Sequence, residues 1–254
     1  MLQNDIHRAL GSRDILLMTH LVLGYPSFAV NRLVVAQMAR AGVELVELQI
    51  PFSEPVADGP VIARACQESI ARGTAVEECL AFAAEMAGSH PKVAFLLMTY
   101  YNIVFRFGED DFLDRARRAR VRGLIIPDLP IEEGAAFFRA TRRAGIDPIQ
   151  IFAPTSTNER MHELEASADG FIYCVARRGV TGAQTAFGPE FDTYLARCRA
   201  ATDLPLAVGF GIRSRDDVDH LVGKADIAVV GSETIRVVDE RGPEAVGPFL
   251  EGLR

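Results

Sequence analysis

Two carboxylates that lie close together in the chain are the first residues that could carry out chemistry. Glu47 lies within an apolar run, residues 43–50, that has the composition of a buried strand. Asp58 follows in a polar turn, directly before the Gly59-Pro60 pair. One acid on a buried strand and a second in the loop after it are suited to moving a proton onto and off a substrate. The alternative is structural: Glu47 would pair with an arginine, and Asp58 would cap the next helix.

The elements that must position these acids alternate along the chain. Strand-like runs are predicted at Ile15–Leu23, Leu45–Ile50, Val93–Thr99, Gly123–Pro127, Pro148–Ala153, Gly170–Val175, Pro205–Phe210 and Ala225–Val230. Helices are predicted at Asp5–Gly11, Ala29–Ala41, Val61–Arg72, Val76–Met86, Glu109–Val121, Ile131–Ala144, Asn158–Ala168, Pro189–Ala201, Ser214–Val222 and Glu244–Leu253. Eight strand–helix units in 254 residues predict one α/β domain, residues 1–254, folded as a (β/α)8 TIM barrel with a short N-terminal helix. An open doubly wound sheet is the alternative, but the first strand leads into residues 23–26 without a glycine-rich dinucleotide motif.

The active site of such a barrel lies at the carboxyl ends of its strands. This rule selects His20, Glu47, Gln49, Tyr100, Asp128 and Tyr173 as candidates.

Glycines after the last two strands predict a phosphate site. Residues 209–212 and 231–233 place glycines before predicted helices or turns, where free backbone N–H groups can bind an anion. The stretch after the sixth strand, residues 177–185, contains two glycines and could close over a bound ligand. The alternatives are tight turns and an ordinary surface loop.

Composition and residue placement exclude several classes of function. A net charge of −7 argues against nucleic acid as a partner, and no apolar run approaches the ~20 residues that a membrane span needs. The four cysteines form no CxxC pair, which predicts reduced thiols in a cytoplasmic protein. Both lysines, Lys92 and Lys224, precede strands, at the wrong end of the barrel for a Schiff base. Of the five histidines only His20 ends a strand, so no metal site is predicted, and His20 is expected to line the pocket or form a hydrogen bond.

Several motifs together resemble the tryptophan synthase alpha subunit family. They are Glu47-Leu48, Pro51-Phe52-Ser53-Glu54-Pro55-Val56-Ala57-Asp58-Gly59-Pro60, Thr99-Tyr100-Tyr101-Asn102, Pro127-Asp128-Leu129-Pro130, Arg177 with Gly179-Val180-Thr181-Gly182-Ala183, Gly209-Phe210-Gly211-Ile212 and Val230-Gly231-Ser232. They follow the family's order across nearly the whole chain, and the stretch from Pro51 to Pro60 is the most specific of them.

The resemblance implies retro-aldol cleavage of indole-3-glycerol phosphate to indole and glyceraldehyde 3-phosphate, without a cofactor. It implies that Glu47 is the general acid/base, that Asp58 accepts a hydrogen bond from the indole N–H, and that Thr181 helps to hold Asp58. It also places Tyr173 beside the substrate and Tyr100 in the pocket lining. The phosphate-binding positions that it implies are Gly182, Phe210, Gly211, Gly231 and Ser232.

The sequence departs from the family's pattern at four positions. Gln49 replaces a usual glycine on the same strand face as Glu47, and its amide could bond to Glu47, the substrate or the following loop. His20 stands where the family often has an apolar or aromatic residue that faces the indole. Glu54 replaces the family's usual aspartate. Tyr25, after the first strand, replaces a common aspartate or asparagine. Sequence drift is one explanation, and altered substrate fit or subunit coupling is the other.

The family pairs its alpha subunit with a pyridoxal-phosphate beta subunit in an α2β2 assembly. Residues 101–105 match a family contact region and predict an exposed apolar loop, or else a cluster packed on a neighbouring helix. Three hypotheses remain: a catalytic alpha subunit working with beta, a stand-alone indole-releasing lyase, and a non-catalytic activator of beta. The presence of Glu47, Asp58 and Thr181 argues against the third, because binding alone would not require them.

Overall fold

The computed structural model describes residues 2–175, 188–209 and 211–254 and has a closed barrel of eight parallel strands at its centre. The strands are β1 Leu16–Val22, β2 Leu45–Gln49, β3 Ala94–Met98, β4 Gly123–Ile125, β5 Asp147–Phe152, β6 Ile172–Val175, β7 Leu206–Gly209 and β8 Ile227–Val230. Each pairs with its neighbour in chain order, and β8 pairs with β1. The predicted (β/α)8 barrel is confirmed, with strand ends differing by one or two residues for most strands.

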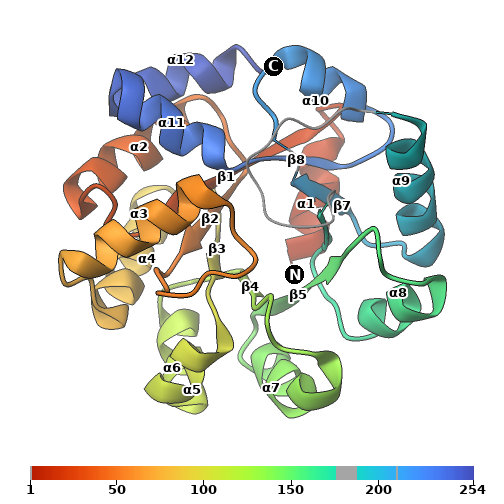
Figure 1. Ribbon diagram of the computed structural model, residues 1–254, viewed down its shortest axis with the longest axis horizontal. Coiled ribbons are helices and arrows are strands. Elements are labelled where there is room, and N and C mark those ends of the chain that lie inside the picture. The colour runs from red at the N-terminus through yellow and green to blue at the C-terminus, as the bar shows by residue number, and fades with distance from the viewer. Residues whose placement is uncertain (1, 176–187, 210) are drawn as a thin grey trace.

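Helices surround the barrel (Figure 1). They are α1 Leu2–Leu10, α2 Phe28–Arg40, α3 Pro60–Ala71, α4 Val76–Ser89, α5 Tyr101–Phe107, α6 Glu109–Arg118, α7 Ile131–Arg143, α8 Asn158–Glu165, α9 Pro189–Ala201, α10 Arg215–Leu221, α11 Ser232–Arg241 and α12 Val246–Glu251, with a 3-10 turn at Pro243–Ala245 before α12. None of them, in the part of the chain that the structure describes, is long and apolar enough to cross a membrane.

Alternation along the strands divides the core into two layers. Val46 and Leu48 point outward into the layer between sheet and helices, whereas Leu45 belongs to the cluster inside the barrel. Side chains two residues apart share a face, so Glu47 and Gln49 also point inward, beyond Leu45 toward the carboxyl end. The strand period therefore aims both polar side chains at the mouth of the barrel.

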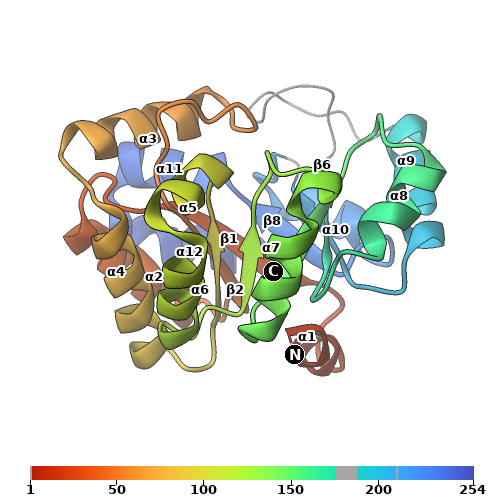
Figure 2. The same cartoon turned by 90° about the horizontal axis from the view of Figure 1, so that it is seen from below.

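Helix α1 closes the opposite end of the barrel (Figure 2). Leu2 and Ile6 are buried in the inner cluster. The backbone N–H of Leu2 donates to Asp147 Oδ2 at 2.9 Å, and Arg122 pairs with Asp5 at 2.6 Å. Because α1 covers the amino ends of the strands, the carboxyl ends are the open side.

Two helices were not predicted from the sequence. Residues 101–107 were expected to begin as a loop, but they form α5. The first N–H group of α5, on Tyr101, donates to Asp128 Oδ1 at 2.9 Å. The helix ends at Gly108, which has a φ of 95°. Residues 232–241 form α11, whose buried Thr234, Ile235 and Val237 follow a helical period. The sequence indicated a helix start or a turn after Gly231, but residues 232–241 were not among the predicted helices.

Lysine and cysteine residues lie where the sequence placed them. Lys92 and Lys224 precede β3 and β8. The four cysteines are free and buried, so Cys174 belongs to the core and is not an exposed nucleophile.

Candidate active site

Glu47 and His20 form a buried pair on adjacent strands. The register of β1 with β2 sets His20 directly opposite Glu47. His20 Nδ1 lies 3.0 Å from Glu47 Oε1, and the two residues are only 3% and 4% exposed. A carboxyl oxygen that carries no proton accepts a hydrogen bond, so with the proton of Glu47 absent from Oε1 the hydrogen of this contact lies on Nδ1. This contact confirms the expectation of a hydrogen-bonded His20 and shows that the partner of Glu47 is a histidine, not an arginine.

The second oxygen of Glu47 and the second nitrogen of His20 remain open. Among the described residues, neither Glu47 Oε2 nor His20 Nε2 has a hydrogen-bond partner. Buried polar atoms are nearly always paired in folded proteins. Two such unpartnered atoms on one contacting pair of residues are therefore a feature expected of a site that binds a polar ligand.

The charges around His20 change its protonation. Burial lowers the pKa of His20, but the charge of Glu47, its hydrogen bond and the charge of Asp58 together raise the pKa above its ordinary value. The pair thus favours an imidazole that holds its proton.

Asp58 is held by two donors at the mouth of the barrel. Its Oδ2 accepts from Gln49 Nε2 at 2.7 Å and from the hydroxyl of Tyr100 at 3.0 Å. The same hydroxyl accepts from the backbone N–H of Ala57 at 3.0 Å. The residue that caps α3 is Gly59. The helix-capping alternative for Asp58 is therefore wrong. Of the three partners expected for the amide of Gln49, the structure shows the following loop.

Burial changes the ionisation of the groups around Asp58. Burial raises the pKa of Asp58, and the charge of His20 and the bonds from Gln49 and Tyr100 oppose this without reversing it. Burial also raises the pKa of Tyr173 well above its usual value, assisted by the charges of Glu47 and Asp58. Tyr173 therefore keeps its hydroxyl proton and can donate it in a hydrogen bond.

Tyr173 reaches the site because the neighbouring strand has no side chain beside it. A Cβ added at Gly209 on β7 would lie 2.6 Å from the hydroxyl oxygen of Tyr173. Gly209 thus makes room for the ring of Tyr173 at the mouth of the barrel. The sequence around Gly209 predicted an anion-binding loop and gave no sign of this packing role.

The glycine-rich ends of β7 and β8 lie at the same end of the barrel. Gly211 has a φ of 62°, a conformation that favours glycine. Gly231 is the N-cap of α11, Ser232 is the first residue of that helix, and no side chain caps it. The first N–H groups of α11 can therefore meet an anion. Thr181, Gly182 and Phe210, and the predicted lid at residues 177–185, lie outside the described residues.

Two arginines that pair with Glu233 beside this helix start, Arg213 and Arg236, were not predicted from the sequence. Glu233 in the first turn of α11 contacts Arg236 at 3.0 Å and Arg213 at 3.7 Å. Arg213 follows the Gly209–Ile212 stretch directly, which was the available signal. The ion pairs limit the negative charge that Glu233 adds beside the glycines.

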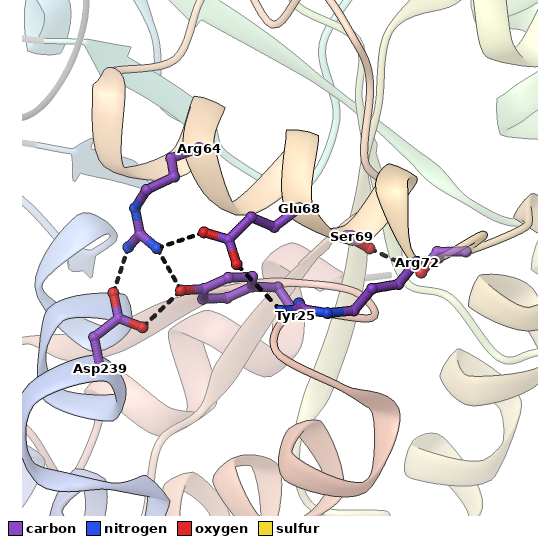
Figure 3. A network of polar contacts seen from close by, with 7 residues as sticks. Tyr25, Arg64, Glu68, Ser69, Arg72 and Asp239 are labelled. Atoms are coloured by element: carbon purple, nitrogen blue, oxygen red, sulfur yellow. Dashed lines mark hydrogen bonds and ion pairs between the residues drawn. The ribbon is translucent and has the colours of Figure 1, made fainter.

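A polar network joins three elements behind the site (Figure 3). The hydroxyl of Tyr25, in the loop after β1, donates to Asp239 Oδ1 on α11 at 2.8 Å and accepts from Arg64 on α3 at 2.6 Å. Arg64 also pairs with Asp239 and with Glu68, and its guanidinium lies 5.3 Å from the centre of the Tyr25 ring. The network therefore connects the helix that follows Asp58 to the helix that begins at Ser232.

Comparisons with known proteins identify the family and agree with the barrel fold. The family model of the tryptophan synthase alpha chain matches residues 8–246. The tryptophan synthase alpha chain of Desulfotalea psychrophila is 61% identical over 242 residues, 95% of each chain, and that of Desulforapulum autotrophicum is 51% identical over 253 residues, 100% of each. Among solved structures, Mycobacterium tuberculosis tryptophan synthase has a TM-score of 0.92 at 29% identity, covering 99% of this chain and 96% of that chain. A tryptophan synthase complex from Pyrococcus furiosus has a TM-score of 0.84 at 27% identity, covering 94% and 97%. This chain belongs to the tryptophan synthase alpha chain family.

Proposed function

We propose that this chain is a lyase that cleaves indole-3-glycerol phosphate to indole and glyceraldehyde 3-phosphate, as the alpha subunit of tryptophan synthase. The observation that carries the proposal is the pair of acids at the barrel mouth, Glu47 buried and Asp58 half-buried, each held through one oxygen by separate partners. Family membership supplies the reaction, and the site supplies groups that suit each step.

Glu47 is proposed as the general acid/base. The cleavage breaks the bond between indole C3 and the adjoining glycerol carbon, while a proton leaves that carbon's hydroxyl group and another joins C3. Glu47 Oε1 is bonded to His20, and Oε2 has no partner among the described residues. The carboxyl group of Glu47 can deliver the proton that joins C3 and accept the proton that leaves the hydroxyl group. It then returns to its starting state without a cofactor.

Asp58 is proposed to stabilise positive charge on the indole ring during protonation. Its Oδ2 is occupied by Gln49 and Tyr100, and its Oδ1 would accept from the indole N–H. A carboxylate fixed in advance stabilises developing charge without reorganising during the reaction. Thr181 is proposed to hold Asp58 further, and Tyr173 to contact the substrate.

The phosphate group is proposed to bind at the glycines and at the start of α11. Gly211, Gly231 and Ser232 lie where backbone N–H groups and the helix dipole favour an anion. Gly182 and Phe210 complete the proposed set, and Tyr100 lines the pocket beside them.

The acid/base assignment is tested with Glu47→Gln. We expect this variant to lose indole release by a factor of at least about 10³, because the amide can neither deliver nor accept the proton. Binding of glycerol phosphate, followed by calorimetry, should stay within about threefold of the wild-type value, because the phosphate site is separate. Glu77→Gln, an exposed change on α4, is the control and should release indole normally. Substantial turnover in Glu47→Gln would refute the assignment.

The proposal includes a partner and a location. A beta subunit in an α2β2 assembly is proposed, since solved relatives are tryptophan synthase complexes. A cytoplasmic location is proposed from the biosynthetic role of the family and the four free thiols, and cell fractionation tests it.

A further inference from the structure

We propose that His20 is a positioning residue for Glu47, holding one carboxylate oxygen so that only the other exchanges protons with the substrate. This inference rests on the proposed lyase function and concerns the same site. It assigns a task to a residue that stands where the family often has an apolar or aromatic side chain.

Three observations on the geometry of the pair support the proposal. His20 and Glu47 lie opposite each other in the β1–β2 register, with both side chains directed into the barrel. Their contact of 3.0 Å joins Nδ1 to Oε1 and leaves Oε2 open among the described residues. Both strands are rigid elements with buried neighbours, so the carboxylate cannot turn freely. A strand-borne hydrogen bond of this kind fixes the rotamer of an acid more firmly than a loop contact would.

The groups facing His20 explain why an imidazole suits this position. Glu47 faces His20 from β2, and Asp58 faces it from the loop after β2. The charges of the same two acids also act on Tyr173, which lies on β6. The other neighbouring strand, β8, reads Ile-Ala-Val-Val and offers no titratable group. An imidazole can donate through Nδ1 whether it is neutral or protonated, so Oε1 stays bonded across neutral pH.

The consequence for the reaction is a division of labour between the two oxygens. Oε1 keeps its hydrogen bond to His20, while Oε2 gives a proton to indole C3 and takes one from the hydroxyl group. His20 itself gains and loses no proton over the cycle. The proton count of the cleavage stays balanced within Glu47 and the substrate.

The test compares two replacements of His20 by steady-state indole release. His20→Phe restores the family's kind of side chain and removes the donor, and we expect kcat to fall on the order of 10- to 100-fold with KM within about threefold. His20→Asn keeps an N–H near the position of Nδ1, and we expect it to recover kcat to within about fivefold of wild type. Thr19→Val is the control: this buried residue is on the same strand but faces outward, away from both acids, and should leave kcat and KM unchanged.

The pH profile separates positioning from a merely structural role. His20→Phe removes a hydrogen bond that favours the ionised form of its neighbour, so the kcat profile should move to higher pH in this variant, whereas His20→Asn keeps a donor and should move the profile less. If His20→Phe does not fold, recovery of kcat in His20→Asn with a profile close to that of the wild type still tests the proposal.

Several outcomes would overturn the inference. They are wild-type kcat and pH profile in His20→Phe, or a loss of kcat in His20→Asn as large as the loss expected for His20→Phe. The parent protein and Glu47→Gln are assayed alongside. If the parent releases no indole, the proposed function itself fails, whereas an active parent with an inactive Glu47→Gln isolates any failure to His20.

Discussion

At the scale of single residues, the chemistry of the site depends on which oxygen of each acid is already bonded. Glu47 is held by His20 through Oε1, and Asp58 is held by Gln49 and Tyr100 through Oδ2. A carboxylate held on one side presents its other oxygen in a fixed direction, which lowers the cost of aligning a substrate. Each of these partners can therefore be tested by a single substitution.

Gln49→Gly should loosen Asp58 without removing it. The change deletes the 2.7 Å bond from the amide and leaves the bond from Tyr100. We expect kcat/KM for indole release to fall about fivefold, which corresponds to roughly 1 kcal/mol for a hydrogen bond that is partly replaced. Gln150→Gly, which removes a buried glutamine from β5, is the control for general destabilisation. Unchanged kcat and KM in Gln49→Gly would mean that the bond contributes nothing to catalysis.

Asp58→Asn should raise the thermal stability of the protein and abolish indole release. The pKa of Asp58 is raised above 3.8 in the folded protein, chiefly by burial, so stability falls as pH rises from the unfolded value through the raised one. At pH 7 the folded state must hold a poorly solvated charge, and asparagine removes it. We expect the melting temperature at pH 7 to rise by ~2–4 °C, on the order of 1 kcal/mol, with a smaller gain near pH 4 and with indole release lost.

Thermal unfolding at the two pH values measures this effect. Asp203→Asn, at an exposed position, is the control and should show no such gain. A decrease in the melting temperature of Asp58→Asn at pH 7, or equal gains at both pH values, would contradict the argument.

At the scale of elements, the position of α3 and α11 relative to the barrel determines where Asp58 and the phosphate site lie. Asp58 directly precedes α3, and Ser232 begins α11. The network around Tyr25 ties both helices to the loop after β1, as Figure 3 shows. Exposed ion pairs contribute little to stability, so the hydroxyl of the buried residue Tyr25 is the contact in this network most able to add to it.

Tyr25→Phe tests this connection. The change removes the hydroxyl that bonds to Asp239 and Arg64 but leaves those two residues paired. We expect a loss of about 1 kcal/mol in the free energy of unfolding, or ~2–4 °C in melting temperature. Tyr101→Phe is the matched control, because its hydroxyl bonds to Glu109 on the adjoining helix at a less buried place. An equal or larger loss in Tyr101→Phe would show that the three-element network has no special importance.

At the scale of the whole molecule, the barrel has one covered end and one open end. Helix α1 covers the amino ends of the strands, and the carboxyl ends carry the candidate site. Two apolar side chains on the open side are exposed, Phe105 on α5 at 66% and Val56 in the loop after β2 at 73%. Val104 beside Phe105 is fully buried, so the predicted apolar contact region is reduced to fewer residues than the sequence indicated. Exposed apolar residues next to a site suit a protein interface.

We propose that the whole chain forms one domain, which a single cooperative unfolding transition would support.

Addition of a purified tryptophan synthase beta subunit should stimulate indole release. We expect Phe105→Asp to reduce this stimulation by about tenfold while leaving the unstimulated rate within about twofold, because a buried charge opposes docking. Val222→Asp, between α10 and β8 at the opposite end of the barrel, should leave stimulation unchanged. High turnover without any stimulation would instead favour the stand-alone lyase.

The sequence by itself determined the barrel, its open end and the two acids. Apolar runs alternating with helical patterns specify parallel strands, and the period of two directs Glu47 and Gln49 to the same face. The elements that escaped prediction were α5 and α11, since short helices that follow strand ends resemble the loops expected there. Local pattern is sufficient for elements whose partners are their own neighbours in the chain.

Only the tertiary structure decided which side chains meet. His20 faces Glu47 from 27 positions away, Gln49 bonds to Asp58 and not to Glu47, and Tyr25 reaches Asp239 across 214 positions. These contacts depend on strand register and on the docking of helices around a closed barrel. The spacing of residues within one segment predicts neither of them. The physical reason is that each bond joins groups brought together by burial of the core, so their distances exist only once the barrel has closed.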